Sequence, residues 1–136
     1  MAPHLYARSL AGKGALPPFD NTNPRAFRDQ VVSLASSVPA AGRFLRAEAA
    51  NENQFQTLGL FAAGVVAANV AGLPRGHLHN FVLTYLASRA VYTVLYVTGD
   101  TPFLANLRTA AYMTGVGSIF TAFVTAGIQF NKVLLL

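Results

Sequence analysis

The sequence predicts an all-helical transmembrane bundle, and three observations lead to that fold class. Charged side chains make up 11% of the 136 residues, whereas soluble globular domains contain roughly 25%. Hydrophobic residues make up 53%, and they gather in three long runs separated by glycine and proline. An arginine lies in or beside each run, and a charge at bilayer depth costs at least ~2.5 kcal/mol, so such a side chain usually faces the interior of a helix bundle. We therefore expect one membrane domain that encloses a buried polar site.

The N-terminal part of the chain differs from the rest. We expect residues 1–39 to form a polar segment and residues 40–136 to form the membrane helical domain. Residues 12–24 are rich in glycine, proline, asparagine and aspartate, which predicts a loop. Residues 24–38 have the spacing of a short amphipathic helix, whose apolar side carries Phe27, Val31 and Leu34.

Three membrane spans follow, at about residues 55–73, 77–98 and 104–130. Pro39 stands at the entrance of the first helix, where proline is tolerated. The uncharged part of this helix is only ~17 residues long, near the lower limit for a span, so we expect the helix to begin earlier with a polar first half. Small residues in the last span, including Gly115 and Gly117, predict close helix packing.

Each of the three helices carries a stripe of polar side chains that includes an arginine. The main members of a stripe are three, four or seven residues apart, so they share one helix face. They are Arg46, Asn53 and Gln56 on the first helix, Arg89, Tyr92 and Tyr96 on the second, and Arg108 and Tyr112 on the third, with Thr109 beside Arg108. Guanidinium groups, amides and phenols suit an anionic ligand that carries carboxylates. An arginine beside a ligand thiol also lowers the pKa of that thiol and so favours the nucleophilic thiolate.

These residues also have structural interpretations. Arg46 lies where its stem can snorkel to the membrane interface, and Arg108 follows a loop where it can anchor that interface. Arg89 lies near the middle of its span, where a structural hydrogen-bonding role is the alternative. The tyrosines are also typical of interfacial belts and of ordinary packing.

The composition argues against several other classes of site. The chain has no cysteine, which excludes disulfides, thiolate metal sites and a cysteine nucleophile. His77 and His79 have no carboxylate beside them, so we expect no metal site. The net charge is +5, but the basic residues do not cluster with aromatic ones, so no nucleic-acid partner is expected. Seven lysines and arginines on the side of the N-terminal segment, against two on the other side, favour a cytosolic N-terminal segment.

Four segments carry a resemblance to a known family. Residues 46–63 read RAEAANENQFQTLGLFAA, residues 88–96 read SRAVYTVLY, residues 108–112 read RTAAY and residues 19–25 read FDNTNPR. The first three are similar, in order, to the polar motifs of the second, third and fourth helices of the MAPEG superfamily, the membrane-associated proteins in eicosanoid and glutathione metabolism. The fourth resembles the loop after the first helix in the fungal members of that superfamily.

The resemblance implies a fold, an assembly and a ligand. It implies four transmembrane helices in each subunit of a homotrimer, with glutathione held at each subunit interface. It also implies a glutathione transferase or peroxidase acting on a lipophilic substrate, in the endoplasmic reticulum membrane with the site facing the cytosol. By this likeness Arg108 polarises the glutathione sulfur with Thr109 as a second donor, and the tripeptide is held by Arg46, Asn53, Gln56, Arg89, Tyr92, Tyr96 and Tyr112.

Three departures from the family pattern leave an alternative open. Gln56 stands where the family has a glutamate that pairs with the ligand ammonium, and Ala49 stands where a second arginine is often found. Residues 3–7 resemble the far end of the first membrane helix, whose apolar body does not precede them here. A glutathione-independent membrane isomerase or cyclase is therefore the alternative function, and a non-catalytic membrane scaffold is a third.

Overall fold

The structure is a computed structural model that describes residues 3–135, and this part of the chain contains helices and no strand, which confirms the predicted all-helical class. The helices are α1 (Pro3–Gly12), α2 (Pro24–Leu34), α3 (Pro39–Val70), α4 (Arg75–Thr98) and α5 (Pro102–Leu134). The chain divides into two compact units. The first holds the residues up to Asn53 together with Tyr96–Thr98, and the second holds Gln54–Leu95 and the residues from Gly99 onward. The predicted division at residues 39 and 40 stays a prediction.

Local signals in the sequence account for where the helices begin and end. Asn23 caps α2 by accepting the Ala26 N–H at 3.2 Å, and Pro24 occupies the first turn. Thr101 caps α5 in the same way, accepting the Leu104 N–H at 3.3 Å. After α3 the chain turns through Gly72, whose φ of 67° lies in the left-handed region that favours glycine. The short amphipathic helix expected within residues 24–38 is present as α2.

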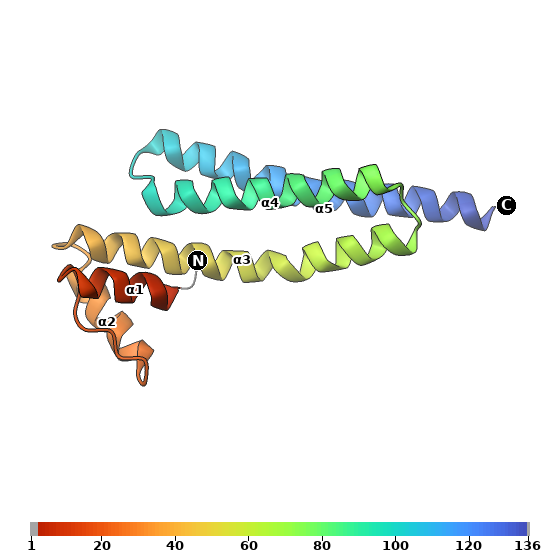
Figure 1. Ribbon diagram of the computed structural model, residues 1–136. Coiled ribbons are helices and arrows are strands. Elements are labelled where there is room, and N and C mark those ends of the chain that lie inside the picture. The colour runs from red at the N-terminus through yellow and green to blue at the C-terminus, as the bar shows by residue number, and fades with distance from the viewer. Residues whose placement is uncertain (1–2, 136) are drawn as a thin grey trace. The chain divides into compact units, whose positions relative to one another are not determined.

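The first unit packs α1 and α2 against the first part of α3 (Figure 1). Its core is apolar and is formed by Ala7, Leu16, Phe27, Val31, Ala41 and Phe44. The ring of Phe27 meets the rings of Phe19 and Phe44 edge-on, with centroids 5.0 and 5.5 Å away. Outside this core Arg28 donates to Glu48 at 2.8 Å, and this contact raises the pKa of Arg28 through a hydrogen bond and Coulomb attraction.

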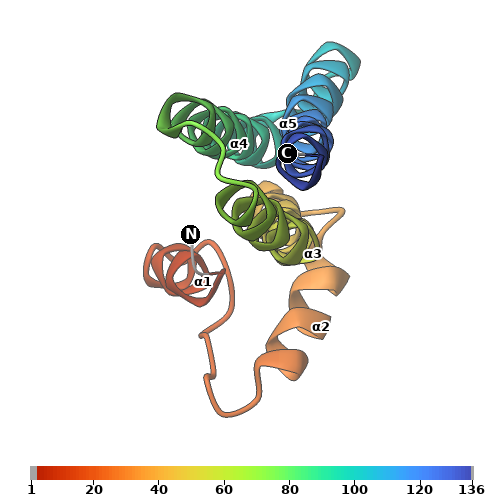
Figure 2. The same ribbon diagram turned by 90° about the vertical axis from the view of Figure 1, so that its right-hand side faces the viewer.

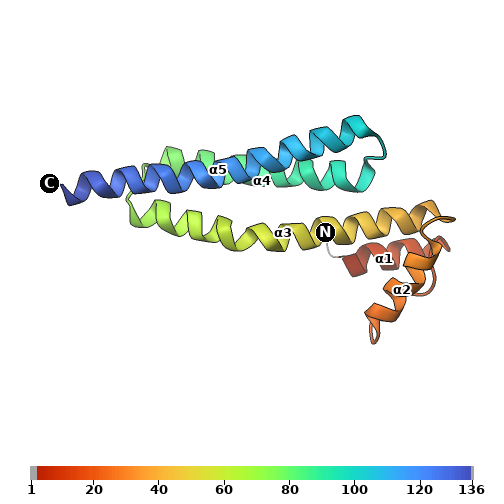
Figure 3. The ribbon, with the colours of Figure 1, turned by 180° about the vertical axis from the view of Figure 1, so that it is seen from behind.

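The second unit is built from α4, α5 and the part of α3 after Asn53. Figure 2 looks along these helices from the connection between α3 and α4, and Figure 3 shows α4 and α5 running side by side. Phe61 stacks on Tyr85 with ring centroids 4.1 Å apart and also touches Phe81. Ile119 and Ala122 of α5 complete the buried cluster. This core is small for helices of such length, so much of their apolar surface faces outward.

Two helices in the described range, α4 and α5, are long and apolar enough to cross a membrane. Only 28% and 22% of their apolar stretches are buried inside the protein, whereas the core helix of a soluble protein is mostly buried. Large apolar side chains such as Leu83, Val94, Phe120 and Val124 are exposed on them. The expected spans at 77–98 and 104–130 lie within these helices, and their membrane boundaries stay predictions. The span expected at 55–73 lies on α3, which ends at Val70.

Close approach between α4 and α5 depends on Gly115. A Cβ built on Gly115 would fall inside the contact distance of Ser88 Oγ, and 3.7 Å from Arg89 Cδ. Ser88 Oγ already donates to the Tyr85 carbonyl at 2.7 Å, so moving it away would break that hydrogen bond. Gly117, two residues later, has nothing within 4 Å of the same added atom.

We therefore predict that Gly115→Ala lowers the free energy of unfolding by about 1–3 kcal/mol, the usual cost of overpacking. Gly117→Ala is the matched control and should be neutral or stabilising by up to ~1 kcal/mol, because alanine has the higher helix propensity. Thermal unfolding of the two variants in the same detergent makes the comparison. Equal stability of the two variants would mean that α4 and α5 do not approach each other this closely.

Candidate functional site

Arg89 is the most deeply buried charged residue in the described chain, and it lies between two tyrosine rings. Its side chain is 5% exposed, and its Nε and Nη1 atoms are fully buried. The guanidinium carbon lies 4.5 Å from the ring centroid of Tyr92 and 5.5 Å from that of Tyr112. Tyr92 is one helical turn along α4, whereas Tyr112 comes from α5, and the two rings are 5.8 Å apart. The structure thus brings three of the predicted site residues together.

Aromatic faces are a suitable environment for a desolvated cation. The negative face of a phenol ring attracts a guanidinium by roughly 0.5–2 kcal/mol, more where water is excluded. Arg89 has such a ring from each of two helices. The pair of rings offsets part of the desolvation cost.

A set of polar contacts between α3 and α4 lies next to this cluster. The side-chain amide of Gln54 donates to Thr93 Oγ1, and Thr93 Oγ1 donates to the Arg89 carbonyl at 2.8 Å. One turn further along α3, Thr57 Oγ1 lies 3.1 Å from the Tyr85 hydroxyl, and both side chains are buried. Gln54, Thr57 and Thr93 are not among the site residues predicted from the sequence. The sequence did contain a signal for them. Thr93 is four residues after Arg89 on α4, and Gln54 and Thr57 are three residues apart on α3, so each pair shares a helix face.

Arg108 and Thr109 lie on α5 one turn before Tyr112. The side chain of Arg108 is partly buried, and Thr109 is exposed. Thr109 Oγ1 donates to the Ala105 carbonyl at 3.1 Å, so its proton is already used within the helix. In this rotamer Thr109 offers a ligand only an acceptor, and acting as a donor would require the hydroxyl to turn outward.

Three predicted site residues belong to the first unit. Arg46 Nε donates to the Val97 carbonyl at 3.2 Å, in the last turn of α4 where carbonyls lack helical partners and favour a cation. Asn53 and Tyr96 are partly buried. Gln56, which belongs to the second unit, is exposed. The structure therefore places the nine predicted residues in two units, and the grouping that it shows is that of Arg89 with Tyr92 and Tyr112.

The charge of the second unit is strongly asymmetric. Its one acidic side chain is Asp100 in the connection to α5, whereas its basic side chains are Arg75, Arg89, Arg108 and Lys132. An unbalanced positive set with phenols beside it suits an anionic ligand. Within residues 3–135 no group of three histidine, aspartate or glutamate side chains is placed to hold a metal ion.

The model of the MAPEG family matches residues 2–128, which is most of the chain. No curated protein and no solved structure matches the chain.

Proposed function

The chain belongs to the MAPEG family, and we propose that it is a membrane glutathione transferase or peroxidase-like enzyme acting on a lipophilic substrate. The family fold is a four-helix membrane bundle, and the family includes glutathione-dependent membrane transferases and peroxidases. The long apolar helices α4 and α5 agree with that fold, and the chain is an integral membrane protein.

The buried Arg89 between Tyr92 and Tyr112 is the observation that carries the proposal. A charge buried inside a membrane protein is energetically costly, and ionisable groups inside membranes usually mark a functional site. Glutathione has two carboxylates, which guanidinium groups bind through paired charge-assisted hydrogen bonds. The excess of basic side chains in the second unit fits those carboxylates. The ligand ammonium fits less well, because Gln56 offers it a neutral amide oxygen.

We assign the chemical step to Arg108. Glutathione would supply a thiol, whose pKa near 8.5 leaves it largely protonated at neutral pH. A guanidinium beside the sulfur lowers the thiol pKa, because it stabilises the charged form. Arg108 is partly buried near the start of α5, where reduced exposure to water strengthens that attraction. The lipophilic substrate would reach the sulfur from the bilayer.

We propose that the protein acts as a homotrimer in the endoplasmic reticulum membrane, with its site open to the cytosol. The exposed apolar faces of α4 and α5 must be covered by lipid or by neighbouring subunits. Small residues on α5, such as Gly117 with no atom within 4 Å of an added Cβ, allow another helix to approach closely. The bias of lysine and arginine towards the side of the N-terminal segment favours the cytosolic orientation.

We predict a trimer in native mass spectrometry of the protein in mild detergent. The reason is that Gln56 and Thr109 face outward on α3 and α5, so a ligand that touches them needs a second surface to enclose it. A monomer that still binds glutathione with full affinity would contradict the proposed interface site.

The neutral side chain of Gln56 favours an alternative function. With a neutral amide at position 56 and alanine at position 49, the chain has fewer charges for glutathione than the family pattern provides. A glutathione-independent isomerase or cyclase that uses the same polar residues is the second candidate. Isothermal titration of glutathione into the purified protein separates the two, and turnover of a lipophile without any thiol separates the isomerase from a non-catalytic scaffold.

We predict that Arg108→Ala lowers kcat at least ~100-fold while glutathione still binds, because loss of one preorganised electrostatic donor acts on the charged sulfur and not on the bound tripeptide. Arg75→Ala is the control, since it removes an exposed arginine at the start of α4, whereas Arg108 lies near the connection that follows the end of α4. The thiolate absorbance of bound glutathione near neutral pH reports the same effect directly. An unchanged kcat in Arg108→Ala would exclude the thiolate mechanism.

We predict that Gln56→Glu tightens glutathione binding by a few-fold to about tenfold, since ~1.4 kcal/mol corresponds to a factor of ten. The new carboxylate would form a charge-assisted hydrogen bond with the ligand ammonium. Gln129→Glu adds the same charge on α5, far along the helix from Arg108, and should leave the affinity unchanged. Titration calorimetry on the three proteins measures the difference. Equal or weaker binding by Gln56→Glu would show that residue 56 does not face the ligand.

A further inference from the structure

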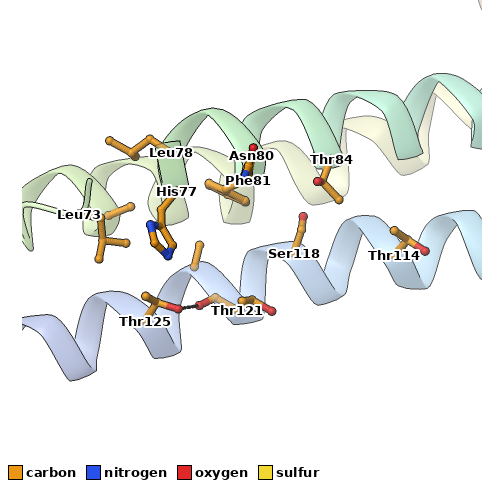
Figure 4. Close-up of a pocket in the computed structure, with 12 residues that line it drawn as sticks. Leu73, His77, Leu78, Asn80, Phe81, Thr84, Thr114, Ser118, Thr121 and Thr125 are labelled. Atoms are coloured by element: carbon orange, nitrogen blue, oxygen red, sulfur yellow. Dashed lines mark hydrogen bonds between the residues drawn. The ribbon is translucent and has the colours of Figure 1, made fainter. Parts of the chain in front are cut away.

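A cavity in the second unit lies near the connection between α3 and α4, and neither the family match nor the proposed function assigns it a role. Its volume is about 380 Å³, which falls within the ~300–1,000 Å³ range of small-molecule sites. All three helices of the unit contribute to the lining. The floor is apolar and includes Ala68, Phe81 and Ala122. Figure 4 shows polar side chains of α4 and α5 around this floor, with the imidazole of His77 projecting from α4.

The α5 side of the cavity is a row of hydroxyl groups whose protons are already used. Thr114, Ser118, Thr121 and Thr125 donate to carbonyls of their own helix at 2.9, 2.7, 2.9 and 2.7 Å respectively. A hydroxyl has one proton and two lone pairs, so each of these oxygens can still accept a hydrogen bond but has none to donate. This side of the cavity therefore suits a ligand group that donates a hydrogen bond.

The α4 side of the cavity adds a hydrogen-bond donor. Asn80 carries an amide that can donate to a ligand oxygen and accept from a ligand proton, and it lines the same cavity. No aspartate, glutamate, lysine or arginine is among the lining residues. His77 is the one titratable side chain in the lining, so an ionised head group would meet no permanently charged partner there, and burying an unpaired charge is costly. The chemistry of the lining thus selects a neutral ligand.

We propose that this cavity binds the hydroxyl head and first carbons of a neutral long-chain lipid alcohol. The hydroxyl proton is donated to an α5 oxygen such as Ser118 or Thr121, the hydroxyl oxygen accepts from Asn80, and the carbon chain lies on the apolar floor. The ligand enters from the bilayer, because the cavity lies between two helices with exposed apolar faces. The inference does not depend on glutathione chemistry. Ser118 is ten residues beyond Arg108 on α5, so the head group lies ~15 Å along the helix from that arginine.

The test uses the full-length protein in lipid nanodiscs and two photoreactive probes. One is 1-dodecanol with a diazirine close to the hydroxyl, and the other is its methyl ether, which has the same chain and oxygen but no donor. We expect the alcohol to label peptides from the first half of α4 and the second half of α5 at least about fivefold more than the ether, the effect of roughly one hydrogen bond. Unlabelled dodecanol should compete, and its methyl ether should not.

Variants locate the site. The double variant Ser118→Ala with Thr121→Val removes two acceptors at nearly constant volume and should reduce labelling by the alcohol several-fold. Val124→Thr, which adds a hydroxyl on an exposed position of α5 outside the cavity, and Arg108→Ala, which affects only the proposed glutathione chemistry, should both label like the wild type. The competition experiment needs no variant, so it remains decisive if the double variant does not fold.

Two outcomes would overturn the proposal. Equal labelling by both probes, spread over the exposed faces of α4 and α5, would show that the cavity is ordinary lipid-facing surface. Efficient disulfide cross-linking of Thr125→Cys between copies of this cysteine-free chain would show that a second copy covers the cavity.

Discussion

The burial of the Arg89 guanidinium is the constraint on which the second unit depends. A desolvated cation is stable only where fixed groups replace water, and here two tyrosine faces from different helices provide part of that replacement. Tyr112 can reach Arg89 only if α5 lies close to α4. That approach requires Gly115, because a Cβ there would collide with Ser88 and crowd the Arg89 stem. The contact of Arg89 with Tyr112 therefore depends on the absence of a side chain at Gly115.

Polar contacts between α3 and α4 support this arrangement. The amide of Gln54 reaches Thr93, whose hydroxyl binds the carbonyl of Arg89 itself, so α3 is tied to the turn of α4 that carries the arginine. The hydrogen bond between Thr57 and Tyr85 adds a second tie one turn away. In the proposed site, an Arg89 held by such supporting contacts would need little reorganisation when a ligand arrives. The same contacts occupy polar groups that would otherwise be buried without partners.

The sequence predicted the helices well and the contacts between them poorly, for a physical reason. Helix ends follow local chemistry, so Pro39 identified the start of α3 without any knowledge of the fold. The helical repeat also placed Arg89 and Tyr92 on one face, since both are properties of a single helix. The ties from Gln54 and Thr57 depend on the register between two helices, which one helix's periodicity does not contain. Gln54 also lies in a stretch of mixed charge, where polarity alone does not distinguish a partner on another helix from water.

The positions of Gln56 and Thr57 on α3 explain why the proposed ligand site belongs at a subunit surface. Successive residues on an α-helix point about 100° apart. Thr57 is turned inward to Tyr85, so Gln56 must face away from the core of the second unit, as its exposure shows. Thr109 on α5 is exposed in the same way, whereas Arg89 and Tyr92 are buried.

A ligand that touches both the exposed and the buried residues must lie at the edge of the unit. One side of it would face the buried cation, and the other side would face whatever covers the helices from outside. A second subunit supplies polar groups for that side, and lipid tails do not, so the partly outward orientation of these residues itself favours an assembly in which the site is completed by a neighbouring chain.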